Sequence, residues 1–329
     1  MKVFNEAIQV AGEKMSTSRL RPGDAWPTVL MLVGCYAGWI LGTTWLFAVS
    51  PLGAIIVTGI AIALHASLQH EAIHGHPFQR QWMNDAMVVP AFTLVIPYAR
   101  FRATHLDHHQ DADLTDPYDD PESNYLDPAR WETLPAAVRA VLLFNNTLLG
   151  RVTVGPVVGT IGFVMNEIRA ARAGDRRVLR GWLLHLGPLA LVLAWVSVAR
   201  MPLWAYLIAA YIGLGLLKIR TFLEHRAHEA SRARSVIIED RGPLAYLFLN
   251  NNYHVVHHLR PDVPWHRLPK VYRANRDRFL EVNDGYLFRS YGEVIGRFLF
   301  TRKDPVAHPL MPNPDGSTPL VRQDQVAAE

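Results

Sequence analysis

The sequence predicts an all-α integral membrane protein, with two transmembrane helical hairpins and a cytoplasmic helical cap that carries clustered histidines. Half of the 329 residues are apolar and only 19% are charged, a low share for a soluble protein. No charged side chain occurs between Asp24 and Glu71, and only Arg200 is charged between Arg180 and Lys218. Each stretch is about twice the ~20 residues that one helix needs to cross a bilayer. Each stretch therefore predicts a pair of spans.

Turn-forming sequences divide both apolar stretches near their middle. SPLG at 50–53 contains a proline and a glycine, and ARMP at 199–202 contains a proline, residues that interrupt helices. We expect one domain over 26–302, a cytoplasmic lead-in at 1–25 and a mobile tail at 303–329, which has few apolar groups to pack. The expected membrane-spanning helices are 26–47, 51–69, 181–198 and 202–219.

The distribution of Lys and Arg predicts how the helices are oriented. The segment between the hairpins carries five arginines between 169 and 180, and the segments before the first and after the last hairpin are also basic. The turns within the hairpins carry only Arg200. Because cytoplasmic loops of membrane proteins are enriched in Lys and Arg, we expect both termini on the cytoplasmic side of a bacterial inner membrane. The arginines then indicate topology and not nucleic-acid binding.

The histidines are concentrated in clusters with helical spacing. Residues three and four apart lie on one face of a helix, so each cluster presents two or three imidazoles together. All the clusters follow a predicted span or lie in a predicted cytoplasmic segment, so they gather at one membrane surface. A single pair at this spacing often has no function, but this number of clusters favours metal ligands. The clusters are His70-x-x-x-His74, His105-x-x-His108-His109, His225-x-x-His228 and His254-x-x-His257-His258.

The number of imidazoles indicates more than one metal ion. Structural zinc takes four protein ligands and catalytic zinc takes three. Cys35 is the only thiol and lies within the first predicted span, which excludes a thiolate site. Imidazole suits zinc, copper, iron and nickel. Two ions with open coordination positions fit the count, and iron that activates dioxygen suits an all-nitrogen pair best, with copper as an alternative.

The stretch His70-Glu71-x-x-His74 also matches the zinc-metalloprotease signature. A protease would need a third zinc ligand and would leave both HxxHH clusters unused, so we do not favour it. If the histidines hold redox metals, Glu71 is either an insert between two ligands or a hydrogen-bond acceptor beside them. Another alternative is a non-catalytic membrane protein whose histidines store or sense metal.

The order of the clusters resembles the membrane fatty-acid desaturase superfamily, which includes acyl desaturases, hydroxylases and carotenoid ketolases. The clusters HxxxH, HxxHH and HxxHH surround two apolar hairpins over residues 26–270, and NNYHVVHHLRPDVPWHRLP at 251–269 is similar to the family's final histidine box. The resemblance implies a non-haem di-iron centre. Just after the fourth span it implies a further ligand, which we assign to His225 with His228 as the alternative. The other implied ligands are His70, His74, His105, His108, His109, His254, His257 and His258.

The resemblance also implies an oxidoreductase that uses O2 and external electrons to desaturate an acyl chain of a fatty acid or lipid. Hydroxylation and carotenoid ketolation remain alternatives at the same site, because VPWHRLP at 263–269 resembles the ketolase branch as much as the acyl-lipid branch. The sequence contains no haem-binding HPGG, no CxxC and no dinucleotide-binding fingerprint. We therefore expect a separate electron donor of the ferredoxin, rubredoxin or cytochrome type.

An acidic run at 111–122 follows the second histidine box. It is either a solvated loop or a source of carboxylates that accept the free N–H of a ligating imidazole and fix its tautomer. In the second case the expected acceptors are Asp107, Asp111 or Asp116. Near the third box, one of the amides at 250–252 either caps the helix, which we favour, or binds a metal through water. We expect Trp265 to anchor the protein at the membrane interface.

Overall fold

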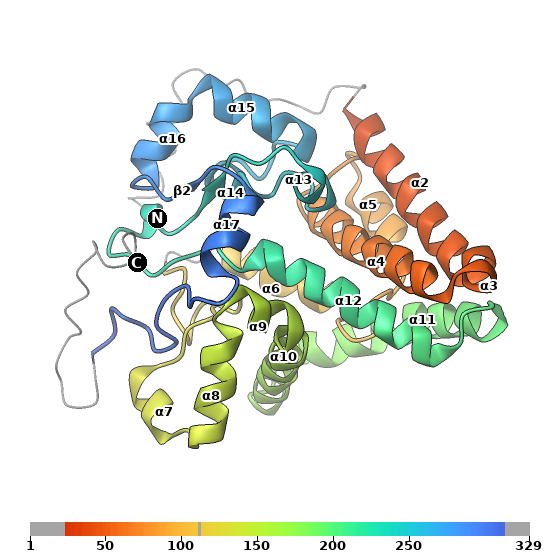
Figure 1. Ribbon diagram of the computed structural model, residues 1–329, viewed down its shortest axis with the longest axis horizontal. Helices are drawn as coiled ribbons and strands as arrows, with labels where there is room; N and C mark the ends of the chain where they lie inside the picture. The colour runs from red at the N-terminus through yellow and green to blue at the C-terminus, as the bar shows by residue number, and fades with distance from the viewer. Residues whose placement is uncertain (1–23, 111–112, 313–329) are drawn as a thin grey trace.

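The computed structural model describes residues 24–110 and 113–312, and most of them are helical (Figure 1). Apart from residues 24 and 25, the predicted lead-in lies outside the described residues, as does the predicted tail from residue 313 onward. In chain order the α-helices are α2 (Ala25–Leu41), α3 (Phe47–Val49), α4 (Pro51–Ile73), α5 (Gln81–Val88), α6 (Tyr98–Gln110), α7 (Pro128–Thr133), α8 (Ala136–Asn145), α9 (Leu148–Thr153), α10 (Gly155–Arg172), α11 (Arg176–Val198), α12 (Leu203–Thr221), α13 (Pro243–Leu247), α14 (His254–Leu259), α15 (Leu268–Ala274), α16 (Arg276–Val282) and α17 (Tyr291–Phe298).

Four of the described helical segments are long and apolar enough to cross a membrane. They correspond to the predicted spans, although α4 continues four residues beyond the predicted end at 69. The extension matters because it places the first histidine cluster at the end of the helix itself. The segments are Ala25–Val49, which joins α2 to α3 through the π-helix η1 (Gly42–Leu46), and α4, α11 and α12.

The predicted turns lie where the sequence places them. Ser50 caps the N-terminus of α4, where its side-chain oxygen accepts a hydrogen bond from the backbone N–H of Gly53 at 3.2 Å. Pro51 occupies the first turn of α4, where its missing N–H costs nothing. Pro202 likewise precedes the first residue of α12. Helix capping and proline together explain why each apolar stretch folds as two helices.

Helices α4 and α12 pack closely along their length, and their C-terminal ends lie toward α14 (Figure 1). Two glycines permit the close approach. A Cβ added to Gly59 would lie 2.9 Å from Cγ2 of Ile212, and one added to Gly213 would lie 2.8 Å from Cγ2 of Ile62. Small residues at helix crossings are typical of membrane proteins, where close van der Waals contact drives association. The crossing fixes the distance between the end of α4, where the first histidine pair lies, and the end of α12, four residues before His225.

The cap consists of short elements after α12. It contains the 3-10 helices η2 (Ser231–Ala233) and η3 (Trp265–Arg267), and a parallel pair of two-residue strands, β1 (Ile237–Ile238) and β2 (Leu287–Phe288). The strands are a small departure from the all-α prediction. The backbone N–H of Val255 donates to the carbonyl of Val236 at 3.2 Å, which ties the start of α14 to the β1 segment.

The chain stays packed beyond residue 302, so the domain boundary predicted there falls too early. Lys303, Val306 and His308 are all buried. The backbone N–H of Leu126 donates to the carbonyl of Val306 at 2.9 Å, and that of His308 donates to the carbonyl of Leu126 at 2.8 Å. The composition of the tail does not predict this contact, because the tail pairs with a loop almost two hundred residues earlier in the chain.

Candidate metal centre

Four distant parts of the chain supply the clustered histidines. The first pair lies at the C-terminal end of α4, where His74 is the residue that follows the last helical position. The second cluster lies in the last two turns of α6, and the third forms most of α14. His225 lies four residues after the end of α12, in a single β-bridge with Ser235. Helix packing, and not chain proximity, therefore assembles the centre.

The imidazoles form two groups, in each of which one ring nitrogen per residue lies within 4.8 Å of all the others. Nine of the histidines predicted as ligands fall into these groups. We call the first the five-histidine group and the second the four-histidine group. The five-histidine group contains His70, His74, His105, His109 and His257, and the four-histidine group contains His108, His225, His254 and His258.

Each HxxHH cluster contributes to both groups. In α6, His105 and His109 belong to the five-histidine group and His108 belongs to the four-histidine group. In α14 the division is the reverse, since only His257 belongs to the five-histidine group. The rings of His109 and His258, from opposite groups, stack with centroids 4.2 Å apart. The spacing of the HxxHH motif thus places two potential metal sites next to each other.

The ring nitrogens have the separations that a shared ion requires. The Nε2 atoms of His108 and His225 lie 3.0 Å apart, as do those of His225 and His254. In the other group, the Nε2 atoms of His74 and His105 are also 3.0 Å apart. Metal–imidazole bonds of about 2.1 Å at right angles would separate two nitrogens by about 3.0 Å. The spacing and the all-nitrogen donor set both fit metal ions.

One buried nitrogen supports the same interpretation. Nε2 of His70 is buried and has no hydrogen-bond partner among the described residues. A buried polar atom without a partner costs about 1–3 kcal/mol. A cation in the five-histidine group would satisfy this atom.

Carboxylates orient two of the α6 imidazoles through hydrogen bonds to Nδ1, the ring nitrogen that points away from the other histidines. Nδ1 of His105 donates to Oε1 of Glu122 at 2.9 Å, and Nδ1 of His108 donates to Oδ1 of Asp120 at 2.7 Å. Each bond puts the proton on Nδ1 and leaves the lone pair on Nε2, which faces the other histidines. The acidic run therefore has the predicted supporting role, through carboxylates that the sequence did not single out.

Two of the carboxylates expected for this role, Asp107 and Asp116, make other contacts. Asp107 projects from α6 with an exposed side chain, 3.8 Å from Arg177. Asp116 accepts from the backbone N–H of Tyr118 at 2.7 Å and so stabilises its own turn. Asp111 lies outside the described residues. The tight turn at 116–120 redirects the chain, so that Asp120 and Glu122 face the histidines instead.

The electrostatics keep several of the imidazoles neutral and favour a nearby cation. Burial, reinforced by neighbouring imidazoles, holds the pKa of His74, His257 and His258 well below 6.5. Burial also acts to lower the pKa of His108, but the carboxylates of Glu122 and Asp120 outweigh it and raise that pKa to about 9. These carboxylates supply negative charge beside the four-histidine group, which favours a cation there.

His228, the alternative to His225, lies elsewhere. Its Nε2 is 3.2 Å from Oδ2 of Asp284, and it belongs to neither group. His225 instead directs Nε2 into the four-histidine group, while its Nδ1 lies 3.3 Å from Oγ of Ser235. Ser235 was not singled out from the sequence, since its part depends on a β-bridge between the residues that flank η2.

Two further expectations near the third box were wrong. The amides at 250–252 make no side-chain cap for α14. Asn251 instead donates to Oε1 of Glu224 at 2.7 Å, while its own Oδ1 lies 3.4 Å from Nδ1 of His254. Trp265 is buried within the protein, where its indole N–H donates to Oγ1 of Thr28 at 3.1 Å. A buried side chain cannot serve as an anchor at the membrane interface.

Glu71 lies outside both histidine groups. Its Oε1 accepts a hydrogen bond from the backbone N–H of Trp265 at 3.1 Å. The carboxylate therefore joins the end of α4 to the segment after α14. This contact gives Glu71 a structural part, and it does not resemble the base of a metalloprotease, which must face the metal-bound water.

Four apolar helices and two adjoining histidine groups define a membrane protein with paired sites suited to metal ions. The chain belongs to the fatty acid desaturase family, because a sequence model of that family matches residues 43–290. It is similar to the "Beta-carotene ketolase" of Paracoccus sp. (strain N81106 / MBIC 01143), with 28% identity over 275 residues that cover 78% of this chain and 97% of the relative. The chain is thus an integral membrane oxidoreductase of the desaturase and hydroxylase type.

Proposed function

We propose that this protein is a membrane non-haem di-iron oxygenase that oxidises a C–H bond of a long apolar substrate with O2. The observation that carries the proposal is the pair of adjoining histidine groups, with five and four convergent ring nitrogens. Nitrogen donors in this number, without a thiolate, suit two redox-active ions better than zinc. The family match supports the same chemistry.

When bound, a pair of iron ions supplies the activation of dioxygen that an unactivated C–H bond requires, since acid–base side chains cannot attack such a bond. The protein's own residues hold the geometry. The Nδ1 bonds of His105 and His108 to carboxylates fix which nitrogen of each ring faces the centre. Burial of most of the cluster excludes water from the reacting atoms.

The similarity to the ketolase favours a carotenoid as the substrate. The ketolase relative is aligned with this chain over 97% of its own length, so the similarity is not confined to a short motif. On this basis we place oxygenation of a carotenoid ahead of desaturation of an acyl chain, which the histidine boxes alone had favoured. Acyl desaturation is the second candidate, supported by the family match.

Electrons must come from a separate protein in this proposal. The sequence contains no haem-binding HPGG, no CxxC and no dinucleotide-binding motif. A ferredoxin, rubredoxin or cytochrome type of donor would have to approach the cap from the side of the histidine groups. The donor and the cytoplasmic position of the cap remain predictions.

Expression in cells that make β-carotene tests the substrate. We expect a new oxygenated carotenoid in the pigment extract, and its loss when His225→Ala removes one nitrogen from the four-histidine group. The matched control is His228→Ala, three residues further on and outside both groups. Unchanged carotenoids beside newly unsaturated fatty acids would establish acyl desaturation instead. If neither product forms in protein that holds iron and receives electrons, both proposed substrates are wrong.

A further inference from the structure

The C-terminal segment 302–308 lies beyond the family match, which ends at residue 290. It pairs with two earlier parts of the chain: Arg302 forms a β-bridge with Thr147, and Ala307 forms one with Leu126. Several of its side chains turn inward and are buried, which is unusual for a short segment of irregular structure. Two series of hydrogen bonds, which we call the first and second routes, connect these inward-facing groups to the four-histidine group.

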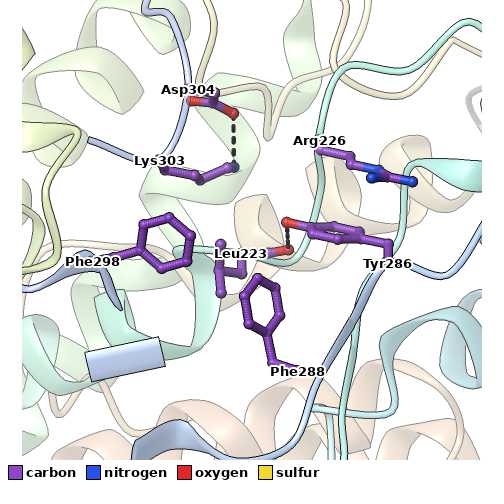
Figure 2. Close-up of a pocket in the computed structure, with 7 residues that line it drawn as sticks. All are labelled: Leu223, Arg226, Tyr286, Phe288, Phe298, Lys303 and Asp304. Carbon is purple, nitrogen blue, oxygen red and sulfur yellow. Dashed lines mark hydrogen bonds and ion pairs between the residues drawn. The ribbon is translucent and has the colours of Figure 1, made fainter. Parts of the chain in front are cut away.

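The first route starts at Lys303. Its Nζ donates to the backbone carbonyl of His225 at 2.6 Å, and its own backbone N–H donates to the carbonyl of Asn146 at 2.9 Å. Nζ also lies 3.4 Å from Oδ2 of Asp304 (Figure 2). Burying an unpaired ammonium costs free energy, so the carbonyl of His225 and the carboxylate of Asp304 together hold Nζ in this position. Lys303 thereby fixes the backbone of a predicted ligand.

Asp304 extends the same route. It accepts hydrogen bonds from the hydroxyl of Tyr125 and from the side-chain amide of Asn146. The Tyr125 oxygen in turn accepts from the backbone N–H of Ala227 at 2.9 Å. The backbone at 225–227 is therefore held at two points, its carbonyl at His225 and its N–H at Ala227.

The second route starts at His308. Its Nδ1 accepts from the backbone N–H of Leu310 at 3.3 Å, so Nε2 carries the proton and donates to Oγ1 of Thr115 at 3.2 Å. The backbone N–H of Thr115 donates to Oδ2 of Asp120 at 2.8 Å. Oδ1 of that carboxylate accepts from Nδ1 of His108 at 2.7 Å. His108 and His225, where the two routes end, belong to the same group.

We propose that segment 302–308 positions the four-histidine group for metal binding, with Lys303 as the principal positioning residue. This inference rests on the proposed function, because it assumes that the group holds one of two iron ions. No hydrogen bond described for the segment reaches a member of the five-histidine group. The segment should therefore affect the two ions unequally.

The variants that test this proposal differ in what they leave at position 303. Lys303→Met keeps an apolar stem and removes the ammonium that bonds to His225. Lys303→Arg keeps a donor at this position, which adjoins a cavity of about 20 Å³ lined also by Arg226, Tyr286 and Phe298 (Figure 2). The control is Lys270→Met, an exposed lysine on the surface of α15.

The experiment measures iron in purified full-length protein loaded with 57Fe. We expect the unaltered protein to hold about two ions, with two Mössbauer signals, one for each histidine group. In Lys303→Met, one signal should change and that ion should pass to a chelator about tenfold faster, while the other ion is unaffected. Lys303→Arg and Lys270→Met should release both ions at the unaltered rate.

Three results would count against these ideas in distinguishable ways. If Lys303→Met releases both ions equally fast, or neither faster, the positioning role is wrong although the di-iron proposal survives. If the unaltered protein does not hold two ions, the di-iron proposal fails first and this inference fails with it. If Lys303→Met does not fold, Thr115→Val interrupts the second route by removing the hydroxyl that meets His308. Equal release or no faster release in that variant would overturn the inference.

Discussion

Beside the four-histidine group, the side chain of Asp120 accepts three hydrogen bonds from His108, Thr115 and Glu122. One carboxylate oxygen accepts from Nδ1 of His108 and from the backbone N–H of Glu122, and the other accepts from the backbone N–H of Thr115. The side chain is buried, so these bonds have no competition from water. It thereby orients a predicted ligand and also shapes the turn that presents Glu122 to His105.

Replacing Asp120 with Asn should weaken iron binding. The amide has one acceptor oxygen for three donors, and its NH2 group would face either the Thr115 N–H or the His108 Nδ1–H. Loss of such a supporting bond lowers metal affinity by about 10–100-fold. Chelator competition with purified protein measures the change. Asp119→Asn, at the exposed neighbouring position, should leave the affinity unchanged. An equal loss in both variants would show that charge in the loop matters and not the contact.

The sequence predicted the histidines of the site better than the residues that support them. Helical spacing identified the clusters in α4, α6 and α14, because periodicity alone puts those imidazoles on one face. The acceptor carboxylates lie in an irregular turn, where no period relates position to direction, so Asp116 was chosen and Asp120 was missed. His225 could be placed only by resemblance, since a single β-bridge sets its direction.

At the scale of helices, the close crossing of α4 and α12 determines where the first pair and His225 lie. Gly213 meets the backbone carbonyl of Gly59 as well as the side chain of Ile62, with separations under 3.0 Å from an added Cβ. The backbone carbonyl cannot move aside without shifting a helix. A wider crossing would also move the histidine pair at the end of α4 away from His225, which follows α12.

Gly213→Ala should therefore destabilise the protein, by about 1–3 kcal/mol as for other overpacked interiors. Loss of soluble protein on heating in detergent, with and without added iron, measures the effect. Gly162→Ala is the matched control, because an added Cβ there meets no heavy atom within 4 Å and alanine favours a helix. If both variants melt at the temperature of the unaltered protein, the crossing is not as tight as described.

Apolar stretches and turn residues predicted the four long helices and their breaks, because membrane length and proline act locally. The short elements of the cap were harder to predict. Strands β1 and β2 have two residues each, too few for any alternating pattern. The packing of segment 302–308 was missed because its partners, such as Leu126 and Asn146, are distant in sequence.

For the whole molecule, the distribution of arginine predicts that the histidine groups face the cytoplasm. Arg172 lies at the end of α10, on the side of the predicted cytoplasmic segment, whereas Arg200 lies in the turn between α11 and α12. Both side chains are exposed. Cys35, the only cysteine, is 1% exposed, so the unaltered chain provides an unreactive background for cysteine labelling.

Single cysteines at these two positions test the orientation. In intact cells, a membrane-impermeant thiol reagent should label Arg200→Cys, which we place outside, and should leave Arg172→Cys unlabelled until the membrane is opened. The unaltered protein, with buried Cys35, should remain unlabelled in both conditions. The reverse pattern would place the histidine groups on the outer side, away from a cytoplasmic donor. An electron donor of the ferredoxin type could not then reach them, and an extracytoplasmic donor would be required.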